Sequence, residues 1–338
     1  MGNDLNQTLG EELVVGLDAG GTRTRAVLAG ADASGPLLGE GAAGPGNALT
    51  VPVPQLTDHL AEAVADAVPE RLRGSVVSVV GGFAGATAAS PDDPGHVNAR
   101  SALTAALRRL GVPAGPVGIC SDIEAAFAAA PGTPADGLAL VAGTGAVAMR
   151  ITDRHATATV DGDGWLLGDD GSGFWIGRAA VRAALRTADG RGPATVLAES
   201  VGRALGLPDE VVPSGRWTRA AREAYRMHLL PAVMAEPPIR LARFAPLVAE
   251  AAAAKDTVAQ AVLDEAAGLL TETVRALEPN PGERIVATGG LLGPDGPLTP
   301  RLTTRLDALG LTLDWVADGS RGAVALACVA HLAHRGAG

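Results

Sequence analysis

The chain is organised around residues 14–29, which read Val-Val-Gly-Leu-Asp-Ala-Gly-Gly-Thr-Arg-Thr-Arg-Ala-Val-Leu-Ala. Two apolar runs, Leu13–Leu17 and Ala26–Ala29, flank the Gly-Gly pair, and this pattern predicts a β-hairpin. Glycine adopts positive φ and carries no Cβ, so a phosphate could lie against the backbone N–H groups of the turn. An ordinary tight hairpin explains the same residues, and this stretch alone leaves both interpretations open.

The polar residues of the turn favour the phosphate interpretation. Asp18 at the end of the first strand suits a Mg²⁺ ion, held directly or through water. Gly20 and Gly21 form the turn, and Thr22 offers a hydroxyl to a phosphate oxygen.

A second hairpin repeats this pattern. The apolar runs Leu138–Ala142 and Val147–Ile151 flank Gly143, Thr144 and Gly145. Two such hairpins, each opening one half of the chain, indicate a duplicated architecture whose Gly/Thr turns face one triphosphate. Nucleotide binding is therefore the leading hypothesis.

Composition excludes several classes of protein. The 338 residues are enough for two domains, 47% are hydrophobic, and no apolar run reaches the roughly 18 residues of a membrane span. The formal net charge of −10 and the small number of aromatic residues argue against binding nucleic acid. The polar segment Met1–Gly10 lacks the pattern of a signal peptide, and Cys120 and Cys328 are the only cysteines. We therefore expect a cytoplasmic protein.

Lys255 is the only lysine, and it lies in an Ala-rich helical run. A P-loop needs Gly-Lys-Ser/Thr and a protein kinase needs a strand lysine, so both are excluded. Phosphate binding must depend on backbone N–H groups, hydroxyls, arginines and metal.

Strands and helices alternate between the two hairpins, which predicts an α/β domain. The strand Val117–Cys120 delivers Ser121 and Asp122 to the start of a helix. Asp122 can cap that helix and can also act as a general base at the carboxyl end of a strand. Asn47 follows a Gly-rich loop and is either a turn residue or a hydrogen-bonding partner of a polyol.

The second half carries further signals. The segment Pro131–Asp136 is the clearest boundary between the halves, and residues 161–177 are too rich in Asp and Gly for a packed strand. Most of the chain from there to Asn280 is expected to be helical. A final Thr288-Gly289-Gly290 lets an adenosine approach the backbone. Cys328, His331 and His334 are spaced as a weak candidate metal face.

Taken in order, these motifs resemble the BadF/BadG/BcrA/BcrD ATPase family and, within it, the N-acetylglucosamine kinases. The resemblance covers nearly the whole chain. It rests on Asp18–Thr22, Gly44–Asn47, Ser121–Asp122, Gly143–Gly145, Gly168–Gly173 with Phe174–Gly177, and Thr288–Gly290. It implies an actin/hexokinase/Hsp70-like α/β fold: two duplicated actin-like (ribonuclease H-like) domains with a cleft between them and a helical insertion in the second.

The expected domains are residues 1–133, with a closing helix 322–338 that packs back on them, and 134–321, with a helical block 176–280. The resemblance assigns ATP and Mg²⁺ to this chain. It implies Asp122 as catalytic base, Asp18 as metal ligand, and Asp18, Gly20, Gly21, Thr22, Gly143, Thr144, Gly145, Gly289 and Gly290 as nucleotide contacts. It places Asn47, Asp122, Ala146, Gly162, Asp163 and Asp169 around the sugar.

Two residues depart from the family pattern in the sugar pocket. Ala146 replaces the usual Ser, and Asp163 replaces a usual Trp, for which Trp165 is a potential substitute. A carboxylate there suits the free ammonium of glucosamine better than an acetamido methyl group.

We therefore expect an ATP-dependent amino-sugar kinase that phosphorylates N-acetylglucosamine or a close relative, at the 6-hydroxyl. Its partner is a small amino sugar, without nucleic acid or membrane, and it is expected to be a homodimer. Two alternatives are a glucosamine-specific kinase and an ATPase activator of a radical dehydratase or reductase.

Overall fold

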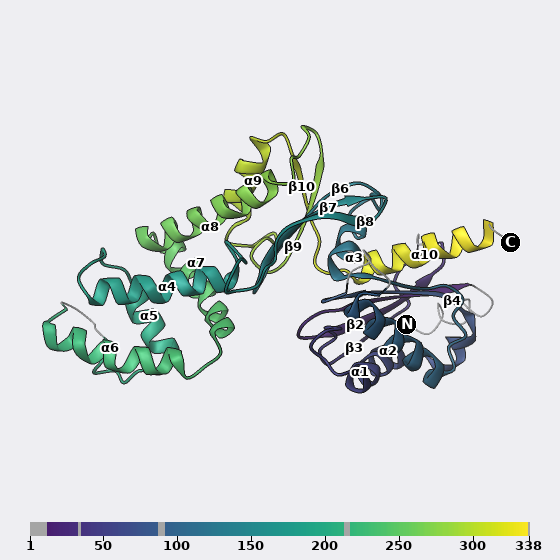
Figure 1. The fold of residues 1–338 in the computed structure, drawn as a ribbon, viewed down its shortest axis with the longest axis horizontal. Coiled ribbons are helices and arrows are strands. Elements are labelled where there is room, and N and C mark those ends of the chain that lie inside the picture. The colour runs from purple at the N-terminus through teal and green to yellow at the C-terminus, as the bar shows by residue number, and fades with distance from the viewer. Residues whose placement is uncertain (1–11, 33–34, 87–91, 213–216, 337–338) are drawn as a thin grey trace. The chain divides into compact units, whose positions relative to one another are not determined.

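The computed structural model describes residues 12–32, 35–86, 92–212 and 217–336 (Figure 1). The segment Met1–Gly10 and the last two residues of the expected closing helix lie outside them. The described residues form two compact units. The first takes its described residues from within the ranges Met1–Ala139, Arg150–Ala158 and Asp314–Gly338, and the second from within Leu140–Met149 and Thr159–Leu313. The expected boundary at residue 133 stays a prediction.

The first sheet confirms the predicted hairpin. Its order is β3-β2-β1-β4-β5, with bounds β1 Leu13–Ala19, β2 Thr24–Gly30, β3 Gly39–Ala43, β4 Val76–Phe83 and β5 Val117–Ser121. β1 pairs antiparallel with β2 and parallel with β4, so the sheet is mixed. In the hairpin register Asp18 lies directly opposite Arg25. Both strands extend two residues further toward the turn than the apolar runs predict, because Thr24 and Ala19 also pair.

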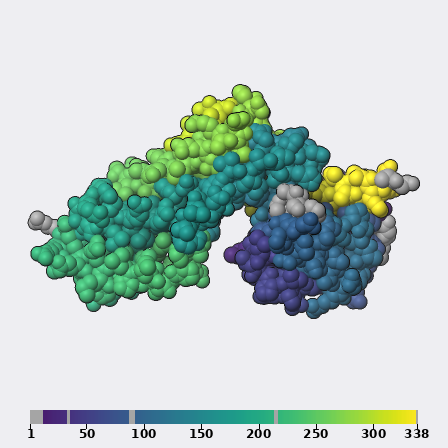
Figure 2. All heavy atoms as spheres, in the orientation of Figure 1, coloured from purple at the N-terminus to yellow at the C-terminus, as the bar shows by residue number. Residues whose placement is uncertain are grey.

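Successive side chains of β1 point to opposite faces of the first sheet, and both faces are buried. Leu13, Val15 and Leu17 pack with helices α1 (Val53–Ala67) and α2 (Pro94–Leu110). Val14, on the opposite face, packs with α3 (Asp122–Ala128) and α10 (Ser320–Gly336). The yellow helix α10 lies directly on the blue atoms of the first unit (Figure 2). Asp18 has the same parity as Val14 and therefore lies on the face that carries α3 and α10.

The second sheet repeats the first. Its strands are β6 Gly137–Ala142, β7 Ala146–Thr152, β8 His155–Asp161, β9 Arg284–Thr288 and β10 Thr312–Trp315, in the order β10-β9-β6-β7-β8. Read from β8, the order is third, second, first, fourth and fifth, as in the first sheet. This match confirms the expected α/β class and its duplicated architecture, and it adds the strand order, which the sequence did not predict. The sequence analysis did not predict β8, whose side chains are exposed or half-buried and therefore lack an apolar run.

The remaining helices are mostly in the second unit. They are α4 Gly173–Ala188, α5 Leu197–Ala204, α6 Arg219–Met234, α7 Ala245–Ala253, α8 Thr257–Arg275 and α9 Thr299–Asp307, with short 3₁₀ turns η2 Glu70–Ser75 and η3 Pro238–Phe244. α7 and α8 are separate helices because Lys255 has a φ of 67° and the Asp256 side chain accepts hydrogen bonds from the first turn of α8. No helix among the described residues is long and apolar enough to cross a membrane.

Candidate functional site

Three carboxylates converge on one face of the first sheet. Asp18 is on β1, Asp122 is the first residue of α3, and Asp318 lies two residues before α10. The backbone N–H of Gly319 donates a hydrogen bond to Asp18 Oδ2 at 3.3 Å, which places the start of α10 beside the end of β1. Asp18 and Asp122 were predicted from the sequence, whereas Asp318 was not, because it becomes their neighbour only through the fold.

Glycines make this convergence sterically feasible. A Cβ on Gly16 would lie 2.4 Å from the backbone N of Val324 in α10, and a Cβ on Gly82 would lie 2.5 Å from the Cβ of Ala125 in α3. A Cβ on Gly322 would lie 1.8 Å from the carbonyl oxygen of Ala125. Both helices therefore sit against the sheet and against each other at distances that only glycine permits.

The cluster raises the pKa of two of its carboxyl groups. Burial, together with the negative charges of Asp122 and Asp318, raises the pKa of Asp18 from 3.8 to about 6. Burial also raises the pKa of Asp122, and hydrogen bonds from its own backbone N–H and that of Ile123 partly offset this increase. A carboxyl with a raised pKa is a stronger base once ionised, which is the property required of a group that accepts a hydroxyl proton.

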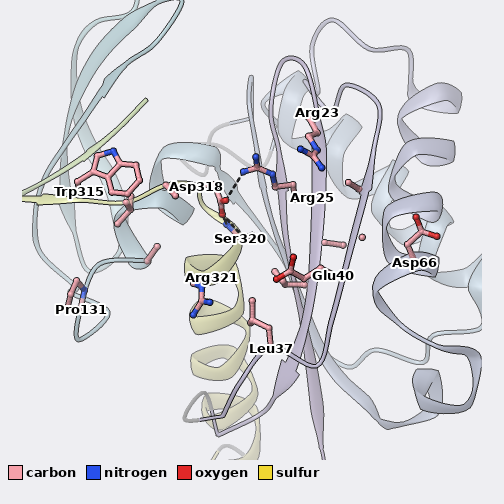
Figure 3. A pocket seen from close by; sticks show the side chains of 17 residues that line it. Arg23, Arg25, Leu37, Glu40, Asp66, Pro131, Trp315, Asp318, Ser320 and Arg321 are labelled. Atoms are coloured by element: carbon pink, nitrogen blue, oxygen red, sulfur yellow. Dashed lines mark hydrogen bonds and ion pairs between the residues drawn. The ribbon is translucent and has the colours of Figure 1, made fainter. Parts of the chain in front are cut away.

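Arginines adjoin the cluster. Figure 3 shows Arg25 reaching from β2 to Asp318, with Nη1 2.6 Å from Oδ2. This pair lies on the wall of a cavity of about 830 Å³ that Arg23 and Arg321 also line. Within the described part of the chain, neither Arg23 nor Arg321 has a carboxylate within ion-pair distance. Arginines were expected to bind phosphate, but no particular arginine was predicted from the sequence. The signal that could have identified Arg25 is its position in the hairpin, where it pairs with Asp18.

Some backbone groups of the first Gly/Thr turn already form hydrogen bonds within the protein. The N–H of Gly20 donates to the carbonyl of Arg23 at 2.9 Å, and the carbonyl of Gly20 accepts from the N–H of Gly46 at 2.8 Å. Gly21 has no atom within 4 Å of a hypothetical Cβ, and Thr22 is exposed. Gly21 and Thr22 are therefore the accessible part of this turn.

The second turn holds the start of α4. The carbonyl of Gly143 accepts the N–H of Gly173 at 2.8 Å, and the carbonyl of Thr144 accepts that of Phe174 at 3.1 Å. Gly145 is needed because a Cβ there would lie 2.8 Å from Asp169 Oδ1. Oδ1 of Asp169 accepts the N–H of Ala146 at 3.1 Å.

Asp161 organises the loop that presents Asp169. Its Oδ1 accepts the N–H groups of Gly162 at 2.7 Å and Asp169 at 2.6 Å, and its Oδ2 accepts that of Asp170 at 2.9 Å. Asp169 is buried with a φ of 57°, a conformation that these bonds support. Asp161 was not predicted, because an Asp-rich segment gives no sign of which carboxylate will accept the backbone N–H groups.

The other residues expected near the sugar differ in whether their side chains already contact other parts of the protein. Asn47 Oδ1 accepts the N–H groups of Leu49 at 2.9 Å and Thr50 at 3.0 Å, so the turn role predicted for Asn47 is present and its carboxamide oxygen is engaged. Asp163 is exposed, whereas the Trp165 ring packs edge-on against Phe174 with centroids 5.7 Å apart.

The expected adenosine region adjoins the second turn. Gly289 has a φ of 105°, and a Cβ there would lie 2.3 Å from the carbonyl oxygen of Ala142. The same carbonyl accepts the N–H of Leu291 at 3.2 Å. Gly290 is open, with no atom within 4 Å of a hypothetical Cβ.

The predicted site residues thus fall into two groups. Asp18, the first turn, Asn47 and Asp122 belong to the first unit; the second turn, Ala146, Gly162, Asp163, Asp169, Gly289 and Gly290 belong to the second.

Among the described residues, no group of three or more His, Cys, Asp or Glu side chains is arranged to hold a metal ion. In the weak candidate face on α10, His331 Nε2 lies 3.0 Å from Glu12 and the Cys328 thiol faces the carbonyl of Gly30. Asp18 and Thr22 offer the oxygen donors that Mg²⁺ prefers when phosphate and water complete its coordination. Burial raises the pKa of Asp18 most, and the negative charges of Asp122 and Asp318, which a cation would offset, raise it further.

Comparisons with known proteins show what this chain is similar to. A curated N-acetylmuramic acid/N-acetylglucosamine kinase of Clostridium acetobutylicum is 33% identical over 98 residues, which is 29% of this chain and 31% of that protein. The chain therefore aligns with about a third of the length of this relative.

Two solved structures share the fold. A protein of Porphyromonas gingivalis, described as a candidate N-acetylglucosamine kinase, has a TM-score of 0.68 at 22% identity, with 95% of this chain and 99% of that chain covered. A similarly described protein of Chromobacterium violaceum has a TM-score of 0.63 at 22% identity, with 94% and 99% covered. The model of one family, the BadF/BadG/BcrA/BcrD ATPases, matches residues 15–298. Because this match spans most of the sequence, the chain belongs to the BadF/BadG/BcrA/BcrD ATPase family.

Proposed function

We propose that this protein is an ATP-dependent amino-sugar kinase. It transfers the γ-phosphoryl group of ATP to the 6-hydroxyl of N-acetylglucosamine or a close relative. The observation that carries the proposal is the half-buried Asp122 at the carboxyl end of β5, beside Asp18, with a raised pKa. Family membership and the N-acetylglucosamine kinases among the similar proteins support it.

The chain's own residues supply the chemistry. Asp122 accepts the proton of the sugar hydroxyl while the hydroxyl oxygen forms a bond to the γ-phosphorus and the bond from that phosphorus to ADP breaks. The turns Gly20–Thr22 and Gly143–Gly145 bind phosphate oxygens, and Gly289 and Gly290 admit the adenosine. When bound, Mg²⁺ would be held by Asp18 and Thr22 and would neutralise charge on the β- and γ-phosphates.

Two features of the second unit bear on the choice of sugar. Asp169 is fixed by Asp161 and bound to the turn through Ala146, so its carboxylate is a defined partner for sugar hydroxyls. Asp163 is exposed and its carboxylate would favour the ammonium of glucosamine, whereas Trp165 offers an aromatic surface to an acetamido group.

The activator alternative has less support. Cys120 and Cys328 are both buried, so neither thiol is placed to share an iron–sulfur cluster with another subunit. Iron analysis of the purified protein tests this alternative, and a stoichiometric cluster would favour it.

We also propose a homodimer formed through the helical block. On α6, Met227, Leu230 and Met234 are exposed at spacings that place them on one stripe of the helix. Light scattering of the wild type and of Met234→Glu tests this proposal. A monomeric wild type would contradict it.

The deciding experiment is release of ADP from Mg-ATP with a panel of N-acetylglucosamine, glucosamine, N-acetylmuramate, N-acetylmannosamine, glucose and a blank without sugar. Turnover confined to one amino sugar supports the proposal. Asp122→Asn should then lower kcat by about 10²–10⁴-fold, the usual contribution of a general base. Hydrolysis that does not depend on sugar would contradict the proposal.

A further inference from the structure

Glu124 is a buried carboxylate two residues from the candidate base. The residue is 2% exposed. Its Oε2 accepts the backbone N–H of Ser121 at 2.7 Å, and Ser121 Oγ accepts the backbone N–H of Glu124 at 3.1 Å. These reciprocal bonds form the capping box that begins α3.

The second carboxylate oxygen makes a contact that a capping box does not need. Oε1 accepts the backbone N–H of Ala156, in β8, at 2.8 Å, and Nδ1 of His155 lies 3.9 Å from the same oxygen. Ala156 belongs to the first unit, as does Glu124. Burial of a carboxylate is costly unless its oxygens are hydrogen-bonded, and here a backbone donor serves each one. Glu124 therefore joins the turn that carries Asp122 to a segment 32 residues further along the chain.

We propose that Glu124 is a positioning residue for phosphoryl transfer, which fixes the turn between β5 and α3 from two sides and thereby holds Asp122 in place. This inference rests on the proposed function, in which Asp122 is the base. The glycine contacts of Gly82 and Gly322 press on Ala125, further along the helix. Glu124 instead accepts the backbone N–H of Ser121, the residue that precedes Asp122 in the chain. It therefore fixes the first turn of α3, from which the Asp122 carboxylate projects.

The charge of Glu124 also reaches the base. Its carboxylate is a cause of the raised pKa of Asp122, after burial. Asp18 on β1 and Cys120 on β5 are each coupled electrostatically to Asp122. Two further titratable groups adjoin these carboxylates: Asp318 raises the pKa of Asp18, and His155 on β8 lies 3.9 Å from Glu124. Neutralising Glu124 should therefore lower the pKa of Asp122, whereas loss of a helix cap should not.

Two variants separate positioning from capping. Glu124→Gln keeps the shape, but its amide NH₂ must face one of the two backbone donors, Ser121 or Ala156. The matched control Ser121→Ala removes the reciprocal cap bond while leaving both bonds of the carboxylate in place. Amide hydrogen exchange at Ala156, a carbon-13 NMR titration of the Asp122 carboxyl (assigned with Asp122→Asn), and kcat and KM with Mg-ATP and the best sugar are measured for each.

For Glu124→Gln we expect faster exchange at Ala156, a lower pKa of Asp122, and a kcat lower by about 10–10²-fold with KM nearly unchanged, because small misplacements of a reacting group are costly. For Ser121→Ala we expect lower thermal stability with the Asp122 pKa and kcat close to those of the wild type.

Unchanged exchange and an unchanged Asp122 pKa in Glu124→Gln would overturn the proposal. Equal losses of kcat in the two variants would also overturn it, since Glu124 would then be only a helix cap. A wild type without sugar-dependent turnover would overturn the proposed function instead. The exchange and NMR measurements need no turnover and would still decide whether Glu124 positions Asp122.

Discussion

Asp18 should destabilise the free protein at neutral pH, and its replacement by Asn should reveal by how much. The pKa of Asp18 is raised from 3.8 to about 6 in the folded chain, so the folded state binds this proton more tightly than the unfolded state. Stability therefore falls as the pH rises from about 4 to about 6 and stays lower above that range. At about 1.4 kcal/mol per pKa unit, the shift corresponds to at most about 3 kcal/mol.

Asp18→Asn removes the charge and keeps the shape, and its carboxamide oxygen can still accept the N–H of Gly319. Without nucleotide and with a chelator, we expect the variant to be more stable than the wild type at pH 7.5 by about 1–3 kcal/mol and nearly equal to it at pH 4. In scanning calorimetry each kcal/mol corresponds to about 2–4 °C for a unit of 150–250 residues. Activity should fall in the same variant, because Asp18 is the proposed Mg²⁺ ligand.

The matched control is Asp209→Asn, at an exposed aspartate of the second unit. It removes the same charge and should change stability by no more than about 0.5 kcal/mol at either pH. If Asp18→Asn were no more stable than the wild type at pH 7.5, the carboxylate cluster would not carry the electrostatic cost argued here. An equal gain at pH 4 would also refute the reasoning, since the effect would then not come from ionisation.

Two further substitutions test the supports of the site. Gly322→Ala should destabilise the protein by about 2 kcal/mol or more, because the new Cβ would lie 1.8 Å from the carbonyl oxygen of Ala125. Gly268→Ala, inside α8, should stabilise it by about 0.5–1 kcal/mol, because no atom lies within 4 Å of the new Cβ. Calorimetry of the two variants checks the sign of each change. Asp161→Asn should raise the KM for the sugar by about tenfold while kcat changes less, because a carboxamide cannot accept hydrogen bonds from all three N–H groups that hold the loop of Asp169. Steady-state kinetics at varied sugar concentration measures both constants. An unchanged KM would contradict the role assigned to Asp161.

The parts of the fold that could be predicted are those whose cause is local. The hairpin of β1 and β2 follows from two apolar runs around Gly-Gly, and Asp122 follows from a short strand that leads into a capped helix. β8 was not predicted because its residues are half-buried or exposed, and a strand held mainly by its neighbour leaves little trace in hydrophobicity.

The site divides in the same way. Asp18 and the two Gly/Thr turns are visible in the sequence because each motif is continuous. Asp318 could not be found, since the chain returns to Asp18 only at the neighbouring Gly319, 301 residues later. Arg25 was within reach, because in a hairpin with this turn it must lie on the same face as Asp18. Asn47 shows the limit of a single interpretation: its carboxamide oxygen serves the turn, which leaves only the NH₂ group for a sugar.

The glycines that pack α3 and α10 explain why the cluster of carboxylates can exist. Three carboxylates held close together repel one another, and this repulsion adds to the larger effect of burial in raising the pKa of Asp18. Such a cluster persists only if the surrounding packing holds the carboxylates together against their repulsion. Gly16, Gly82 and Gly322 provide that packing by letting two helices press against the sheet at backbone distance. The same close contact leaves the carboxylates with few neutralising partners, Arg25 among them. The free protein therefore holds its candidate site in a state that a cation and a proton-donating hydroxyl would relieve, which is the condition expected of a site that binds Mg-ATP and deprotonates an alcohol.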